Sequence, residues 1–74
     1  MLEKIKNQII NFLEANYNEF SNLEDSETCT LDLSEDLNYE IVKYLKSIER
    51  FDYRGLCIYY VIENDEVWVE NMAA

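Results

Sequence analysis

The last third of the chain holds two largely apolar runs, residues 55–62 and 67–70, separated by a short polar segment, residues 63–66. Their many β-branched and aromatic residues predict two β-strands. If Asn64 and Asp65 form a two-residue loop, the strands make a hairpin in which Ile62 lies opposite Val67 and Val61 lies opposite Trp68. One face of that hairpin is apolar enough to seed a core, and it carries Leu56, Ile58, Tyr60, Ile62, Val67 and Val69.

The other face of the predicted hairpin is also rich in apolar residues. It carries Cys57, Tyr59, Val61 and Trp68, ringed by Glu63, Glu66 and Glu70. A sheet surface in contact with water is normally polar, so we expect something to cover this face. A loop, the C-terminal residues, a second subunit or a partner protein would each satisfy that expectation.

The rest of the chain predicts two helices and one further strand. Residues 2–20 carry apolar side chains at i, i+3/i+4 and i+7, which indicates an amphipathic helix. Residues 28–33 alternate strictly and predict a half-buried strand. Ser34 is a suitable N-cap for a second helix over residues 35–50, whose first turn is acidic and whose later half is basic. Residues 51–55 then form the turn into the hairpin, because Gly55 can take a positive φ at little cost.

The element order is therefore α-β-α-β-β, which predicts an α+β fold. The simplest packing is a two-layer sandwich, in which both helices lie on one face of a three-stranded sheet. A right-handed crossover through the second helix makes the first two strands parallel. The third strand then lies either between them, antiparallel to both, or at the edge of the sheet, and we expect the first arrangement. Residues 1–74 form a single small domain, with residues 71–74 as a frayed tail. One face of the sheet stays open.

The charge of the chain is strongly acidic and unevenly distributed. Sixteen acidic residues against six basic ones give a formal net charge of −10. Residues 23–40 hold seven of the acidic residues and no basic residue. This distribution argues against direct binding to nucleic acid or to an acidic membrane, since both depend on Lys and Arg. At 49% hydrophobic residues, the composition is nevertheless that of a folded domain.

Most chemistry is excluded by what the chain lacks. Without histidine it has neither the commonest general base nor the commonest metal ligand, and a single glycine cannot build a phosphate-binding loop. The acidic residues around 24–36 lack the spacing and the glycine of a calcium loop. Cys57 lies among aromatic residues in an acidic protein, which raises a thiol pKa and disfavours a nucleophile. We therefore expect no enzyme activity, cofactor or metal.

Two expectations concern the compartment. The N-terminal residues alternate between polar and apolar, so they form no signal-peptide h-region and the cytoplasm is the expected location. Cys29 and Cys57 fall in separate predicted strands without metal-ligand spacing, which favours two reduced thiols in that compartment.

An acidic surface combined with exposed aromatic residues is typical of a protein-binding site. We predict binding to a basic surface, as found on proteins that handle nucleic acid, with carboxylates standing in for phosphates and two aromatic anchors. The candidate residues are Glu24, Asp25, Glu27, Asp32, Glu35, Asp36, Glu40, Tyr59 and Trp68. In its small size, acidity and lack of catalytic residues the chain resembles nuclease-immunity, anti-restriction and anti-CRISPR inhibitors, some of which are DNA mimics. This likeness of type carries over no residues. The alternative is an acidic adaptor or structural module that homodimerises through the open sheet face.

Overall fold

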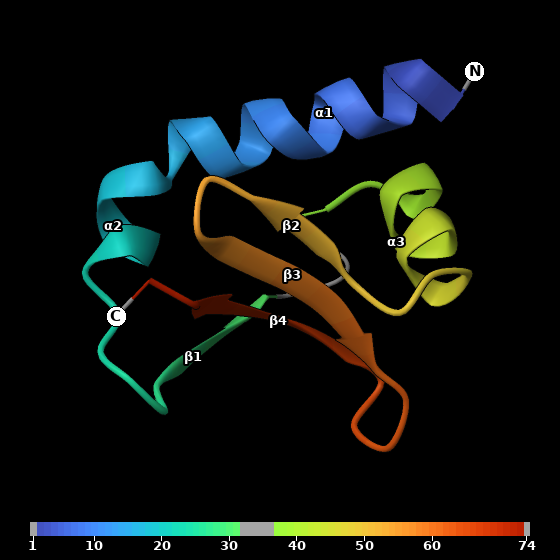
Figure 1. Ribbon diagram of the computed structural model, residues 1–74. Coiled ribbons are helices and arrows are strands. Elements are labelled where there is room, and N and C mark those ends of the chain that lie inside the picture. Colours follow the sequence, from blue (N-terminus) through green and yellow to red (C-terminus); the bar gives the residue numbers. More distant parts are fainter. Residues whose placement is uncertain (1, 32–36, 74) are drawn as a thin grey trace.

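The structure is a computed structural model that describes residues 2–31 and 37–73, and it has an α+β fold. The helices are α1 (Leu2–Ala15), α2 (Tyr17–Ser21) and α3 (Tyr39–Lys46). The strands are β1 (Thr28–Leu31), β2 (Phe51–Tyr53), β3 (Leu56–Val61) and β4 (Glu66–Asn71). They form an antiparallel sheet in the order β1-β4-β3-β2, and the helices lie on one side of it (Figure 1). As expected, β4 lies between β1 and β3 and is antiparallel to both.

The prediction of a three-stranded sheet is wrong, because residues 51–55 are not only a turn. Phe51 and Tyr53 belong to β2 and pair with β3 opposite Ile58 and Leu56. The turn itself is Arg54-Gly55, and both residues have positive φ, 48° and 82°. Two such residues are what a tight two-residue hairpin loop requires. The chain therefore contains a second hairpin, which extends the sheet by one edge strand.

The register of the β3–β4 hairpin also differs from the prediction. Tyr59 pairs with Trp68 and Val61 with Glu66, so the loop has four residues, 62–65, instead of two. A shift of two residues leaves every side chain on its predicted face, since the period of a strand is two. It does remove Ile62 from the core, where we expected it, and leaves this side chain 75% exposed. Glu63 likewise lies in the loop rather than on the sheet.

Both predicted helices are shorter than expected. The first ends at Ala15 and α2 begins at Tyr17. Between them, the Asn16 side chain donates a hydrogen bond to the Phe12 carbonyl oxygen (2.9 Å), which also accepts the Asn16 backbone N–H (3.2 Å). Such side-chain bonds compete with helical backbone bonds. The second helix begins at Tyr39, where Asn38 caps the Ile41 N–H (3.0 Å), and not at residue 35. The predicted cap, Ser34, lies outside the described residues.

The core lies between the helices and the inner face of the sheet. It is formed by Ile9, Leu13, Phe20, Leu31, Leu37, Ile41, Val42, Leu45, Leu56, Ile58, Val67 and Val69. The hairpin residues among these were predicted from the alternation pattern. No helix in residues 2–31 and 37–73 is long and apolar enough to cross a membrane.

The turn of the second hairpin is fastened to the helical layer. The Arg54 guanidinium lies 2.7 Å from a Glu14 carboxylate oxygen and 4.5 Å from the centre of the Tyr17 ring. Tyr53 donates a hydrogen bond to the same carboxylate (2.6 Å), and Tyr17 donates one to the Arg54 carbonyl oxygen (3.1 Å). The hydrogen bonds from Tyr53 and Arg54 lower the pKa of Glu14. These contacts fix the edge of the sheet against α1.

Asn71 is part of β4 and pairs with Leu56, so it does not belong to the frayed tail expected at residues 71–74. Its side-chain amide donates hydrogen bonds to the carbonyl oxygens of Ser21 and Leu23 (2.9 and 3.2 Å). The Met72 N–H donates to the Gly55 carbonyl oxygen (2.7 Å), which continues the contact between the two hairpins.

Candidate functional site: the outer face of the sheet

The outer face of the sheet is the side turned away from the helices. Strand alternation and the observed register place on it Thr28, Thr30, Asp52, Cys57, Tyr59, Val61, Glu66, Trp68 and Glu70. No described helix lies over this face (Figure 1). Two rows cross the sheet here, one through Cys57 and Glu70 and the next through Tyr59 and Trp68.

The centre of the outer face is the aromatic pair Tyr59 and Trp68. Their ring centroids lie 6.3 Å apart with an interplanar angle of 66°, which is the favourable edge-to-face arrangement. The Tyr59 hydroxyl donates a hydrogen bond to Glu70, and the Trp68 Nε1–H donates one to Glu66 Oε1 (3.1 Å). All four side chains are half-buried. The polar end of each ring is therefore tied to a carboxylate on the same face.

The environment of the Tyr59 hydroxyl opposes its ionisation. Burial, followed by the hydrogen bond to Glu70 and the charge of that carboxylate, raises the pKa of Tyr59 to about 12 from an ordinary value of 10.0. The phenol therefore stays a hydrogen-bond donor to Glu70 into the alkaline range.

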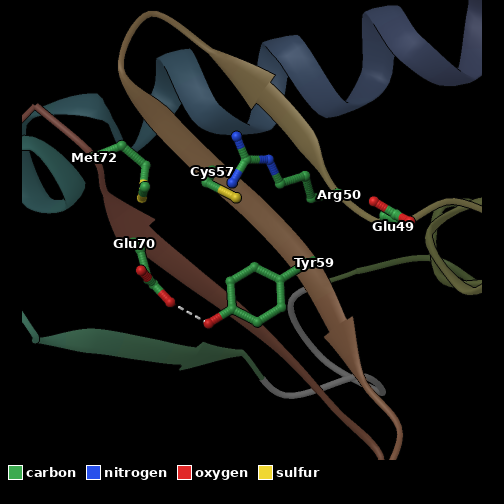
Figure 2. A pocket seen from close by; sticks show the side chains of 6 residues that line it. All are labelled: Glu49, Arg50, Cys57, Tyr59, Glu70 and Met72. Carbon is green, nitrogen blue, oxygen red and sulfur yellow. Dashed lines mark hydrogen bonds between the residues drawn. The ribbon is translucent and has the colours of Figure 1, made fainter.

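Beside this pair the surface forms a shallow hollow of about 260 Å³ (Figure 2). It is lined by Glu49, Arg50, Cys57, Tyr59, Glu70 and Met72. The Arg50 guanidinium lies 3.1 Å from the Asp52 carboxylate, so part of its charge is compensated within the protein. The hollow therefore combines an aromatic ring, an apolar side chain and carboxylates.

Cys57 lies on the outer face as predicted, but it is only 2% exposed. Burial, with a further contribution from a hydrogen bond with Asp52, raises the pKa of this thiol to about 11. The direction agrees with the prediction from sequence. Since the thiolate is the reactive form, the Cys57 environment opposes nucleophilic chemistry at neutral pH.

Four of the acidic candidates from residues 23–40 are described by the structure, and they occupy two different segments of the chain. Glu24, Asp25 and Glu27 are exposed in the segment that leads into β1. The Glu27 carboxylate closes this turn by accepting a hydrogen bond from the Glu24 N–H (2.8 Å). Asp32, Glu35 and Asp36 lie outside the described residues.

Glu40 lies in the first turn of α3, where it lines a hollow between α1 and α3 together with Lys4 and Gln8. That position is in the helical layer, on the opposite side of the sheet from Trp68. Glu40 is therefore not placed beside the aromatic pair. Of the described acidic candidates, Glu24, Asp25 and Glu27 precede β1 and Glu40 belongs to α3.

Among the described residues, the carboxylates on the same face as the aromatic pair are Glu66 and Glu70, with Asp52 at the edge strand. Strand alternation already placed Glu66 and Glu70 on this face. Asp52 was missed, because its segment was predicted as a turn. The alternation of Phe51, Asp52 and Tyr53 was the signal that could have identified it.

The outer face has the chemistry of a cation-binding surface, because it offers carboxylate acceptors beside aromatic rings. Within residues 2–31 and 37–73, no three His, Cys, Asp or Glu side chains are grouped so that they could hold a metal ion. Comparison of the chain with protein-family models, with curated proteins and with solved structures found no match.

Proposed function

We propose that this protein is a small cytoplasmic, non-catalytic inhibitor that binds the basic nucleic-acid-binding surface of a nuclease or defence protein. Binding uses the outer face of the sheet and prevents nucleic acid from reaching the same surface. The observation that supports this proposal is the Tyr59–Trp68 pair, which lies between the carboxylates Glu66 and Glu70 on a face without a described helix over it.

Aromatic anchors surrounded by polar groups are the usual composition of a protein interface. The hydrogen bonds to Glu66 and Glu70 hold both rings in place before a partner arrives. Less side-chain freedom is then lost on binding, which increases affinity for a given contact area. Trp68 and Tyr59 supply the anchoring contact, and the adjacent carboxylates supply specificity for a basic partner.

The net charge of −10 supports a basic partner over a second copy of the chain. A symmetric dimer brings the same patch of both subunits together. Face-to-face dimerisation would thus bring the Glu66 and Glu70 carboxylates of two copies close to one another, and like charges in contact oppose association. A basic surface is instead attracted from a distance. The other exposed carboxylates, such as Glu24 and Asp25, add to this long-range attraction.

Affinity capture from a cell lysate, followed by displacement, tests the proposal. Three tagged proteins are compared: the natural chain, the double variant E66Q/E70Q, and E40Q as a charge control in the helical layer. Gln retains a hydrogen-bond acceptor for Tyr59 and Trp68, so the fold is preserved. The partner captured by the natural chain is then purified and loaded with labelled nucleic acid.

We expect equimolar natural chain to release the labelled nucleic acid, with an effect that weakens as salt is raised. E40Q should behave like the natural chain, whereas E66Q/E70Q should neither capture the partner nor release nucleic acid. Equal capture by E66Q/E70Q would reject the outer face as the site. A partner that keeps its nucleic acid in the presence of the natural chain would reject inhibition by occlusion. A dimer in sedimentation that W68A dissociates would favour self-association instead.

A further inference from the structure

Three side chains of β4 form a straight row on the outer face. Glu66, Trp68 and Glu70 alternate along the strand and therefore point to the same side of the sheet. Because a strand rises about 3.3 Å per residue, the Cα atoms of the two glutamates are separated by roughly 13 Å, with the Cα atom of Trp68 midway between them. The indole itself is bonded to Glu66 through its N–H. The row is thus carboxylate, aromatic ring, carboxylate.

We propose that this row binds an extended segment of the partner in which two arginines, four residues apart, pair with Glu66 and Glu70. This inference rests on the proposed function and specifies its partner. With the arginines at i and i+4, the residue at i+2 faces the same side and lies over Trp68. The segment runs along β4, as a strand does when two sheets pack with aligned strands.

Both carboxylates retain capacity for such a partner. An ionised carboxylate can accept about four hydrogen bonds, and each of these two accepts one from an aromatic side chain. That bond also fixes the orientation of the carboxylate. Glu70 borders the hollow, where the exposed Met72 side chain gives the stem of an arginine an apolar support (Figure 2).

Arginine suits this arrangement better than lysine does. Its planar guanidinium pairs with a carboxylate through two parallel hydrogen bonds and can also stack on an aromatic ring. Lysine carries a compact, strongly hydrated charge, so it can form neither the two parallel hydrogen bonds nor the stacking contact. The protein itself contains an example of such stacking, since Arg54 lies over the Tyr17 ring while it pairs with Glu14.

The spacing of the row favours an extended segment over a helix. Residues i and i+4 of a strand lie on one face and are roughly 13 Å apart, which equals the separation of the two glutamates. In a helix the same two residues are only about 6 Å apart along the axis. A helical partner with arginines at i and i+4 therefore matches the spacing of the two glutamates less well than an extended segment does.

Trp68 provides the readout, because it is the single tryptophan of the chain. Disulfide-closed hairpin peptides without aromatic residues are titrated into the full-length protein at low salt, and Trp68 fluorescence is recorded. One peptide carries arginines at i and i+4. A second, of identical composition, carries them at i and i+3, on opposite faces, and a third replaces both with lysine. E66Q/E70Q and E40Q serve as site and control variants.

We expect the i, i+4 arginine peptide to bind about tenfold more tightly than either of the other two. This preference should disappear in E66Q/E70Q and persist in E40Q. Equal affinity for both arginine spacings would overturn the proposed row. Suppose that the two arginine spacings bind the natural chain equally well and that both bind E66Q/E70Q more weakly. The row is then rejected, but the outer face still binds a basic partner and the proposed function is retained. If E66Q/E70Q binds all peptides as tightly as the natural chain does, the outer face is not the site and both proposals fail.

Discussion

The Tyr59 hydroxyl donates a hydrogen bond to the Glu70 carboxylate across the β3–β4 pair. Glu70 lies directly opposite Cys57, so this bond runs diagonally between neighbouring rows of the sheet. Both partners also line the hollow around the Cys57 thiol. One hydrogen bond therefore links the aromatic pair, the carboxylate of the proposed site and the surroundings of the buried thiol. The titration of Tyr59 can be used to detect this bond.

Replacing Tyr59 with Phe removes the hydroxyl but keeps the ring. At pH 8 we expect the free energy of unfolding to fall by about 1 kcal/mol, because the hydrogen bond to Glu70 is lost. The pKa of Tyr59 is raised to about 12 from its ordinary value of 10.0, so its contribution to stability is present below pH 10 and is lost as the pH rises through 12. Stability of Y59F should therefore depend less on pH between 10 and 12. Urea unfolding, followed by circular dichroism, measures both effects.

Y39F is the matched control, since Tyr39 is 76% exposed on α3. Its stability should follow that of the natural protein at each pH. Parallel pH profiles for Y59F and the natural protein would mean that the hydrogen bond to Glu70 does not form in solution.

Cys57 should react slowly with thiol reagents. Its pKa of about 11, compared with an ordinary value of 9.0, lowers the thiolate fraction at pH 8 by about 100-fold, and burial lowers access further. A Cys29→Ala variant leaves Cys57 as the single thiol for alkylation with iodoacetamide. We expect the native rate at pH 8 to be at least about 100-fold below the rate in concentrated urea. Similar rates in the two conditions would contradict the observed burial.

Asn71 should stabilise the end of the fold through its side chain. Its amide donates hydrogen bonds to the Ser21 and Leu23 carbonyl oxygens, and alanine would leave both carbonyls without this donor. We expect N71A to lower the free energy of unfolding by about 1–3 kcal/mol, and N71D to be at least as destabilising because a carboxylate cannot donate. Thermal unfolding by circular dichroism is the measurement. N64A, in the exposed hairpin loop, should change stability by less than about 0.5 kcal/mol.

Two turn positions should respond to substitution in opposite directions. Gly55 has a φ of +82°, and a Cβ atom there would lie 3.1 Å from the Cβ of Ala73. We expect G55A to destabilise the protein by about 1 kcal/mol or more.

Ser26 has a φ of 74° in an exposed turn, so S26G should relieve strain and raise stability by up to about 1 kcal/mol. The urea midpoints of both variants measure these changes in stability. A loss of stability in S26G would argue against a positive φ at Ser26.

The side chains that face the core of the hairpin could be predicted from sequence. Leu56, Ile58, Val67 and Val69 are buried as expected, because alternation along a strand is a local property. Glu66 and Glu70 were assigned to the aromatic face for the same reason. A strand of only three residues, Phe51–Tyr53, offered too short a pattern, so the fourth strand and the position of Asp52 were missed.

The sequence by itself determined the class of the fold, the faces of the main strands and the strong negative charge. It favoured a position of β4 between β1 and β3, but a position at the edge of the sheet fitted the same pattern, and strand pairing in the structure decided between the two. The tertiary structure decided the hairpin register, since a shift of two residues leaves the alternation pattern unchanged and only the paired strands distinguish the two loops. It also decided which charges surround Tyr59 and Trp68. Glu27 and Glu40 belong to one acidic stretch of the sequence but lie before β1 and in α3, whereas strand pairing brings Glu66 and Glu70 to the aromatic pair.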